Sequence, residues 1–334
     1  MTGRTGPRAI HAVAPGPAAT SDVVEDEQPP SSAAVRVRAP GKVNLDLHVD
    51  ALGDDGYHRL VTVFQAVSLV EEVEVSPSQG LSISVSGPQA ELVPIDSSNI
   101  AWRAAELVAQ RVGIEPDVHV HLRKGVPVAG GMAGGSADGA ATLLACDTLW
   151  GAGLGRAELL ELAAELGSDA PFGLLGHTAV GTGRGHLLTP AMTRGDFHWA
   201  FGLRHEGMST RAVYDAFDAR CDREGPVAYV DEPQTAMMQA LRAGDATALG
   251  ACLRNDLQDA SLELNPALGE VMDVARGAGA LGVMVSGSGP TVAALARSPQ
   301  HALAIAAAMT AANVVDDVAT AVGNAPGARV VSGR

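Results

Sequence analysis

Alternating apolar and polar residues predict where the ordered part of the chain begins. Residues 35–38 alternate as in a half-buried strand, and a second alternating run covers residues 43–49. Turn-forming residues occupy positions 53–56, and residues 61–75 predict further strand with a polar break. The pattern therefore predicts a β-rich opening in which the segment 39–42 separates two strands.

Helical spacing begins farther along the chain. Apolar residues from Ile100 follow the cap cluster at residues 96–99 with helical periodicity, and residues 118–122 alternate again as a strand. Further helices are predicted at 136–149, 156–166, 169–175, 210–217, 235–242, 245–253, 266–275 and 299–312. A strand, a turn and a second strand are predicted within residues 281–295. This mixture of elements predicts an α+β fold.

The length of 334 residues predicts two domains, at about 150 residues per domain. Residues 1–34 are rich in proline, alanine and glycine and lack apolar periodicity, so we expect a disordered leader; a translation start near Val35 would remove it. We place the two domains at residues 35–195 and 196–320, followed by a C-terminal tail at residues 321–334.

Composition and charge exclude several classes of protein. A formal net charge of −15 repels nucleic acid and anionic lipid surfaces. Three cysteines without a CxxC pair indicate neither a disulfide framework nor a thiolate zinc site. No apolar stretch approaches the ~20 residues that span a bilayer. We therefore expect a cytoplasmic protein with no nucleic-acid, membrane or obligate protein partner.

The strongest local motif is a glycine-rich loop between a predicted strand and a predicted helix. It comprises Pro127, Val128, Ala129, Gly130, Gly131, Met132, Ala133, Gly134, Gly135, Ser136 and Ala137. Residues with small side chains let backbone N–H groups approach a polyphosphate, and the positive end of the following helix attracts anions. The alternative is a turn that only allows close packing. The order strand, loop, helix favours phosphate binding, although the chain has no Walker A sequence.

Two other patterns have structural interpretations. Gly277, Gly279 and Gly282 form a G-x-G-x-x-G sequence, but it follows a helix and precedes a strand, so we interpret it as a helix C-cap turn. His119 and His121 share one strand face without a third ligand at a recognisable spacing, so ordinary half-buried side chains are favoured over a zinc site.

Three smaller features gain meaning from their combination. Lys42 and Asn44 share one face of a predicted strand, and Asp169 precedes a short helix, where it could simply be an N-cap. Residues 286–290 form a Ser-Gly loop that could close over phosphate or be only a hairpin turn. Phosphoryl transfer to an alcohol needs an amide cradle, a carboxylate that accepts the hydroxyl proton and a nearby cation. The set matches that requirement.

These motifs carry a family resemblance over about residues 35 to 320. The segments 40–44, 127–138 and 286–289 resemble, in order and spacing, the three motifs of the galactokinase, homoserine kinase, mevalonate kinase and phosphomevalonate kinase (GHMP) superfamily. Within it, Asp55-Gly56-Tyr57-His58-Arg59-Leu60 and Gly167-Ser168-Asp169-Ala170-Pro171-Phe172 resemble the 4-diphosphocytidyl-2-C-methyl-D-erythritol kinase family. The resemblance implies an N-terminal domain like the second domain of ribosomal protein S5 and a ferredoxin-like C-terminal domain.

The resemblance also implies a reaction and roles for individual residues. The reaction is ATP-dependent phosphorylation of the substrate's 2-hydroxyl, in the methylerythritol phosphate route to isopentenyl diphosphate, with Mg²⁺ carried on ATP. Lys42 and Asp169 would be catalytic, and Asn44 would support the hydroxyl. The loop 127–137 would hold the ATP phosphates. Asn99 and Lys124 match positions near adenosine, whereas Tyr57, His58, Thr210, Tyr214, Ser286 and Gly287 would contact the substrate.

The chain departs from the commonest family loop at Met132, Ala133 and Ala137. Ala133 stands where the family loop has a glycine, and an alanine is tolerated there only if its φ stays negative. One alternative function is another GHMP kinase, acting on mevalonate, phosphomevalonate or homoserine, whose substrates lack the nucleobase that Tyr57 and His58 would bind. Another is a nucleotide sensor without turnover, which the presence of both Lys42 and Asp169 disfavours.

Overall fold

The computed structural model describes residues 34–54, 56–225 and 227–331. The expected leader therefore lies outside the described residues, apart from Ala34. Within the described part, the strands form two separate sheets.

The larger sheet is built around two long antiparallel strands, β1 and β2. Its strand order is β12-β1-β2-β4-β3, while β5 pairs with β2, β6 with β5, and β8 with β1. These strands are β1 Val35–Leu52, β2 His58–Pro77, β3 Ser82–Ser86, β4 Val118–Arg123, β5 Thr178–Thr182, β6 Leu187–Pro190, β8 Arg254–Asn255 and β12 Arg329–Val330. The two strands expected around residues 39–42 are one strand, because a register shift between Pro40 and Gly41 absorbs the proline.

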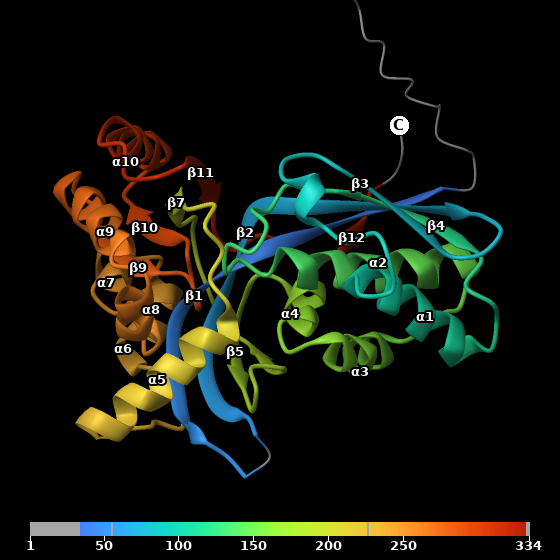
Figure 1. Cartoon of the computed structure of the whole chain (residues 1–334), viewed down its shortest axis with the longest axis horizontal. Coiled ribbons are helices and arrows are strands. Elements are labelled where there is room, and N and C mark those ends of the chain that lie inside the picture. The colour runs from blue at the N-terminus through green and yellow to red at the C-terminus, as the bar shows by residue number, and fades with distance from the viewer. Residues whose placement is uncertain (1–33, 55, 226, 332–334) are drawn as a thin grey trace, which may run out of the picture. The chain divides into compact units, whose positions relative to one another are not determined.

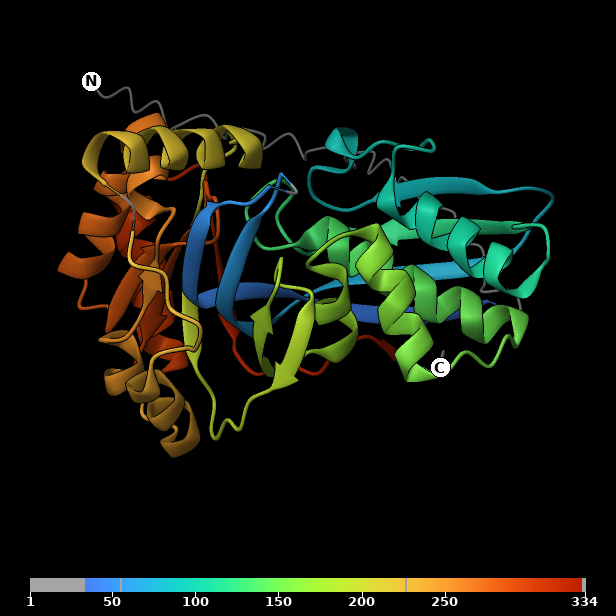
Figure 2. The same ribbon diagram turned by 90° about the horizontal axis from the view of Figure 1, so that it is seen from below.

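Four helices cover one face of this sheet (Figures 1 and 2). They are α1 Ile100–Val112, α2 Gly134–Trp150, α3 Arg156–Leu166 and α4 Ala170–Leu175; the 3₁₀ turn η1 Ala90–Leu92 precedes them. Helix α2 lies between the sheet and its neighbours and buries Ala137, Ala140, Ala141 and Ala145. Alanine side chains let α2 approach close to the sheet, where it packs against β1 and β2.

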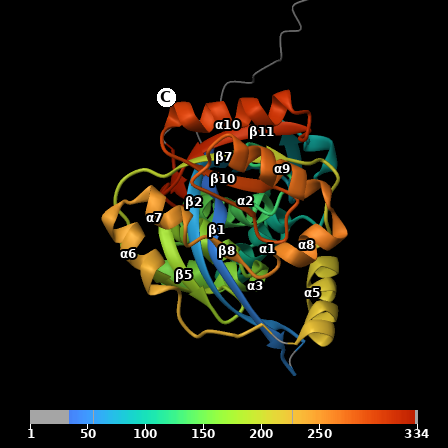
Figure 3. The same ribbon diagram turned by 90° about the vertical axis from the view of Figure 1, so that its left-hand side faces the viewer.

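The smaller sheet is antiparallel, with the strand order β11-β7-β10-β9. Its strands are β7 His198–Leu203, β9 Gly282–Val285, β10 Val292–Ala296 and β11 Asp317–Val322. The associated helices are α5 Thr210–Glu224, α6 Thr235–Ala243, α7 Ala246–Gly250, α8 Gln258–Leu264, α9 Ala267–Gly277 and α10 Pro299–Ala311. Helices lie between β7 and β9 and between β10 and β11, which is the ferredoxin-like arrangement (Figure 3). The expected α+β class is confirmed.

The end of the chain differs from the expected tail. Within the described residues 321–331, the first two end β11, and β12 then pairs with β1 through Val37 and Val330. The tail prediction missed this strand because two residues carry no readable periodicity. The turn at Gly277 and Gly279 ends α9 as expected, with Gly279 at φ 83°. The domain boundary near residue 195 stays a proposal, since β8 from beyond it pairs with β1.

Candidate active site

The glycine-rich loop connects β4 to α2 and turns its backbone toward a cavity of about 520 Å³. Its anchor is Met132, whose side chain is buried and whose carbonyl accepts a 3.0 Å hydrogen bond from the Lys42 N–H. At Gly131, with φ +71°, an added Cβ would lie 2.3 Å from the Ser286 carbonyl oxygen. Only glycine therefore allows the loops at residues 131 and 286 to touch.

Most of the predicted loop residues line this cavity: Pro127, Ala129, Gly130, Gly131, Ala133, Gly134, Gly135 and Ser136. Val128 instead lines a neighbouring cavity of about 290 Å³, and Met132 and Ala137 are buried in the core. The first residues of α2 thus face the cavity with backbone N–H groups that lack partners within the helix. A phosphate group would meet these amides and the positive end of the helix.

The backbone of Ala133 corrects one expectation. Its φ is +58°, in the left-handed region, where we expected a negative value. Ala133 is the N-cap of α2, and the chain reaches the helix from the loop only through this left-handed residue. The conformation costs an alanine about 1–2 kcal/mol, and the buried anchor at Met132 holds it in place.

Lys42 and Asn44 face the cavity from β1 and touch each other. Lys42 Nζ donates a 2.6 Å hydrogen bond to Asn44 Oδ1, and Asn44 Nδ2 donates a 2.9 Å bond to Thr62 Oγ1. Lys42 Nζ also lies 3.6 Å from Asp169 Oδ2 and 5.8 Å from the centre of the Phe64 ring. The predicted catalytic pair is thus brought together, with a neutral amide as the second partner of the ammonium.

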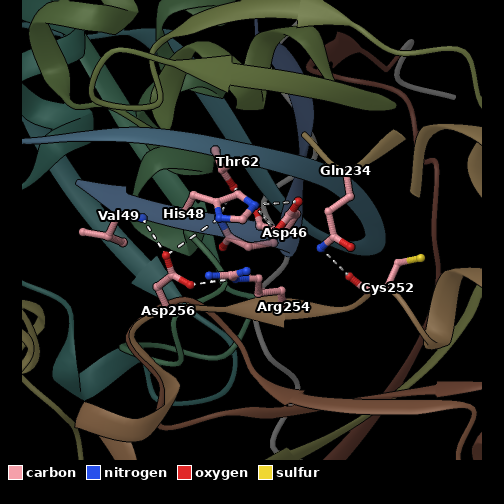
Figure 4. Close-up of polar contacts among 9 residues, drawn as sticks. Asp46, His48, Val49, Thr62, Gln234, Cys252, Arg254 and Asp256 are labelled. Carbon is pink, nitrogen blue, oxygen red and sulfur yellow. Dashed lines mark hydrogen bonds and ion pairs between the residues drawn. The ribbon is translucent and has the colours of Figure 1, made fainter. Parts of the chain in front are cut away.

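A β-bulge between Asn44 and Asp46 decides which side chains of β1 reach the cavity. After the bulge, Leu47 lines the cavity, whereas Asp46 does not and pairs with His48 at 3.1 Å (Figure 4). Strict alternation would have put Asp46 beside Asn44. The bulge keeps this second carboxylate away from Lys42.

Asp169 stands at the N-cap position of α4 without acting as a cap. Its side chain makes no cap hydrogen bond, and its backbone, at φ −91° and ψ −14°, is in the right-handed helical region instead of the extended region typical of an N-cap. The carboxylate is 30% exposed and faces Lys42. The N-cap interpretation of Asp169 therefore fails, which leaves its oxygens available for chemistry.

The Ser-Gly loop after β9 closes the cavity from the side of the smaller sheet. Gly287 lines the cavity with φ +56°, and a Cβ there would lie 3.4 Å from Lys42 Nζ. Ser286 is fully buried, and its hydroxyl donates to the Gly131 carbonyl at 3.3 Å. Asn255 fixes the loop, because its Nδ2 donates to the carbonyls of Val285 and Gly287 at 2.9 and 2.7 Å.

A third cavity, of about 760 Å³, adjoins the first and shares Thr210 and Tyr214 with it. Tyr57 and His58 line it together with Arg184, which lies 4.5 Å from the centre of the Tyr57 ring. His58 packs against Tyr214 with ring centres 4.9 Å apart. Its Nδ1 lies 2.8 Å from the Asp50 carbonyl and its Nε2 lies 3.5 Å from Asp218 Oδ2.

Tyr214 also connects this third cavity to Asp169. Burial, and to a smaller extent the charge of Asp169, raises the pKa of the Tyr214 phenol. The phenol therefore stays protonated at neutral pH, and Tyr214 presents an uncharged ring to both cavities.

Lys124 and Asn99 are engaged in contacts within the protein. Lys124 Nζ lies 2.7 Å from Glu71 Oε1 and also bonds to Asp138. Burial first, and then the charge of Asp138, raises the pKa of Glu71 to about 7; burial raises that of Asp138 to about 6. Burial alone would lower the pKa of Lys124, but the two carboxylates outweigh it and raise it.

The two residues differ in their access to a cavity. Lys124 lines the cavity of about 290 Å³ beside the glycine loop. Asn99 caps α1 by accepting a hydrogen bond from the Ala101 N–H at 2.8 Å, and it does not line any of the three cavities.

Several residues of the site were missed by the sequence interpretation, notably Thr62, Phe64, Glu71, Asp138 and Asn255. Composition gives a separate signal, for two residues that were predicted. Of the chain's 23 lysines and arginines, only Lys42 and Lys124 are lysines. Both are buried in the described structure, at 6% and 5% exposure. Because every other basic residue of the chain is an arginine, a lysine at these positions indicates that they need a compact ammonium group.

The described residues contain no helix long and apolar enough to cross a membrane and no cluster of three or more His, Cys, Asp or Glu side chains that could hold a metal ion. His119 and His121 lie within 2.8–2.9 Å of the hydroxyls of Ser82, Ser84 and Ser86.

Comparison with known proteins identifies the class to which the chain belongs. The models "GHMP kinases N terminal domain" and "GHMP kinases C terminal" match residues 99–177 and 237–315. A crystal structure of 4-(cytidine 5'-diphospho)-2C-methyl-D-erythritol kinase is similar, with TM-score 0.71 and 32% identity over 87% of this chain and 99% of that one. A homoserine kinase from Cytophaga hutchinsonii, with TM-score 0.69 and 21% identity over 91% of this chain and 99% of that one, shares the fold. The chain is thus a small-molecule kinase of the GHMP class, and kinases of this class use ATP.

Proteins similar in sequence identify the family within the GHMP class. The 4-diphosphocytidyl-2-C-methyl-D-erythritol kinase of Thermobifida fusca is 52% identical over 89% of this chain and 98% of its own length. The enzyme of the same name from Streptomyces coelicolor is 51% identical over 89% of this chain and 99% of its own length. The chain belongs to the 4-diphosphocytidyl-2-C-methyl-D-erythritol kinase family.

Proposed function

We propose that this protein transfers the γ-phosphoryl group of ATP to the 2-hydroxyl of 4-diphosphocytidyl-2-C-methyl-D-erythritol, giving the 2-phosphate and ADP. The observation that carries the proposal is the uncapped Asp169 carboxylate 3.6 Å from Lys42 Nζ, in a cavity that also exposes the amides of the glycine loop. The adjoining cavity at Tyr57 and His58 is lined by aromatic side chains that suit a nucleobase.

In the proposed mechanism the substrate hydroxyl loses its proton to Asp169 as its oxygen bonds to the γ-phosphorus. The bond between that phosphorus and the β,γ-bridging oxygen breaks, and ADP leaves with the electron pair. Lys42 stabilises the negative charge that develops on the transferring group, and Asn44 holds the ammonium in place. The loop 127–137 binds the ATP phosphates through its N–H groups. Asp169 then releases its proton to solvent.

Magnesium fits the oxygen donors of this cavity. Ser136 supplies a hydroxyl at the start of α2, ATP itself supplies phosphate oxygens, and hard cations prefer oxygen ligands. When bound with ATP, Mg²⁺ would neutralise phosphate charge during transfer. We propose Ser136 as the residue that faces it.

The remaining predicted contacts concern the cytosine of the substrate and the adenosine of ATP. Because the Asp50 carbonyl can only accept, His58 Nδ1 carries a hydrogen. We propose that the ring edge, whose Nε2 lies 3.5 Å from Asp218 Oδ2, faces the cytosine. We propose that Tyr57 stacks on the base while Thr210 and Tyr214 form the opposite wall, and that Ser286 and Gly287 position the substrate. Lys124 and Asn99 remain proposed to lie near adenosine, Lys124 through the cavity beside the loop.

ADP release by the purified protein tests the proposal. The protein is given ATP and Mg²⁺ with 4-diphosphocytidyl-2-C-methyl-D-erythritol, mevalonate or homoserine in parallel. We expect turnover with the first substrate alone and none with the Asp169→Asn variant. Turnover with another alcohol would discard the nucleobase pocket. ATP binding without turnover on any substrate would favour a nucleotide sensor.

A further inference from the structure

The catalytic lysine is the last member of a chain of hydrogen bonds that begins at the β-bulge in β1. The Thr62 hydroxyl lies on β2, where it donates to the Asp46 carbonyl at 2.7 Å and accepts from Asn44 Nδ2 at 2.9 Å. Asn44 Oδ1 in turn accepts from Lys42 Nζ at 2.6 Å. The side chains of all three cavity-facing members are buried, and Thr62 is 0% exposed.

Elementary donor and acceptor rules give this chain a direction. A backbone carbonyl can only accept, so the single hydroxyl hydrogen of Thr62 must point to Asp46. Toward Asn44 the hydroxyl is then left with lone pairs and can only accept. Asn44 must therefore turn its NH₂ group to Thr62 and its oxygen to Lys42. Were the amide reversed, its NH₂ group would face the ammonium.

The far end of the chain is itself held firmly. The Asp46 carboxylate pairs with His48, whose other ring nitrogen lies 3.8 Å from Asp256 Oδ2. Asp256 accepts from the Val49 N–H at 3.1 Å and from Arg254 at 2.8 Å. Figure 4 shows this cluster, with Thr62 beside Asp46. These contacts hold the side chain of the residue whose carbonyl accepts from Thr62.

We propose that Thr62 is a positioning residue for the kinase reaction, which orients the Asn44 amide so that its oxygen anchors the Lys42 ammonium. The inference rests on the proposed role of Lys42. Because Asn44 is neutral, it takes one N–H of Lys42 without cancelling its charge. The other N–H groups stay available for Asp169 and the transferring phosphoryl group.

The first test reads the ammonium directly and needs no turnover. Protein labelled with ¹⁵N in lysine can give only two side-chain ammonium signals, from Lys42 and Lys124, and Lys42→Arg identifies the first. In Thr62→Val we expect the Lys42 signal to shift or to be lost through faster hydrogen exchange, while the Lys124 signal stays in place. In Thr62→Ser both signals should match the wild type. A Lys42 signal unchanged in Thr62→Val would overturn the proposal.

The second test separates positioning from a merely structural role through a double-mutant cycle. Thr62→Val should lower kcat about 10- to 100-fold, the cost of a misplaced catalytic group, with KM values for both substrates nearly unchanged. In an Asn44→Ala background it should lower kcat no further, because Thr62 acts through Asn44. An equal loss in that background would refute the proposal.

Thr178→Val is the matched control. Thr178 is also buried, on the neighbouring strand β5, and its hydroxyl bonds to Asn324 Oδ1 at 3.3 Å, away from Lys42. We expect it to lower stability but leave kcat unchanged; a kcat loss equal to that of Thr62→Val would count against the proposal. If Thr62→Val does not fold, Thr62→Ala supplies the same comparison without added bulk. A wild-type enzyme inactive on the cytidyl substrate would remove the proposed function, whereas the ammonium signals would still decide the role of Thr62.

Discussion

Replacing Asp169 separates the two interpretations of this residue more sharply than any other change. An N-cap would lose stability when truncated, whereas a general base would lose turnover. The structure favours the second outcome, because the Asp169 side chain makes no cap hydrogen bond and contacts Lys42. Asp169→Asn and Asp169→Ala should therefore fold and bind ATP nearly as well as the wild type.

The size of each effect follows from the contacts. A partly exposed ion pair contributes about 0–1 kcal/mol, so the free energy of unfolding should change by no more than about 1 kcal/mol. Lys42 keeps its bond to Asn44 in the variants. General-base catalysis contributes about 10²- to 10⁴-fold, which at 1.36 kcal/mol per tenfold raises the activation barrier by about 3–5 kcal/mol.

Asp245→Ala provides the control for a real cap. Asp245 precedes α7 and accepts from the Thr247 and Ala248 N–H groups, both at 3.0 Å. Its loss should cost about 1 kcal/mol of stability and leave kcat unchanged. The assays are ADP release, ATP titration and urea denaturation on the same preparations. The reasoning fails if Asp169→Asn keeps more than about a tenth of wild-type kcat, or if Asp169→Ala loses stability as Asp245→Ala does.

Three further changes test other parts of the site. Ala133→Gly relieves the strain of a positive φ, by about 1–2 kcal/mol. This relief exceeds the added chain entropy of about 0.5–1 kcal/mol, so urea denaturation should show the variant to be more stable than the wild type, and a loss of stability would contradict the strain. Glu71→Gln removes a carboxyl whose pKa is raised to about 7 by burial and by Asp138. A carboxyl with a raised pKa stabilises the folded protein at low pH and loses that contribution as the pH rises through 7. The stability of the variant relative to the wild type should therefore rise between pH 5 and pH 8, by up to about 3 kcal/mol. A difference in stability that does not change with pH would show that Glu71 does not titrate in this range. Tyr57→Ala should raise KM for the cytidyl substrate about 5- to 150-fold, the loss of one stacking contact, and an equal rise in KM for ATP would point to a general loss of the fold.

Local chemistry explains why part of the site could be predicted from the sequence. The glycine loop, the start of α2 and the shared face of Lys42 and Asn44 depend on neighbours within a few residues, and the structure places them as expected. Several helix boundaries follow from the same kind of signal; α3, for example, covers the predicted Arg156–Leu166. The α+β class could be predicted because it depends only on the order of such elements.

Features set by distant contacts could not be predicted. The positive φ of Ala133 was not predicted because an alanine by itself disfavours it; the neighbouring anchor at Met132 and the start of α2 impose this conformation. β12 is two residues long and exists only because β1 offers it a free edge. Asp169 looked like a cap because its neighbours in sequence resemble a helix start; its carboxylate turns away because Lys42, far away in sequence, lies opposite.

The two lysines show how composition could have supported what the local pattern and the family resemblance indicated. Lys42 Nζ must reach the Asn44 amide oxygen and the Asp169 carboxylate from one point. Gly287 lies beside it, and a Cβ added there would be only 3.4 Å from Nζ. Lys124 must meet two carboxylates in a space where all three side chains are buried. A guanidinium is planar and wider, and its fork suits one bidentate partner better than separate partners in different directions. A chain that uses arginine for its surface charge therefore still needs lysine at these two positions. Because the sequence contains only two lysines, their number alone indicates both positions. The count cannot identify Glu71 and Asp138 as partners of Lys124, because only the packing of α2 against β2 brings those carboxylates together.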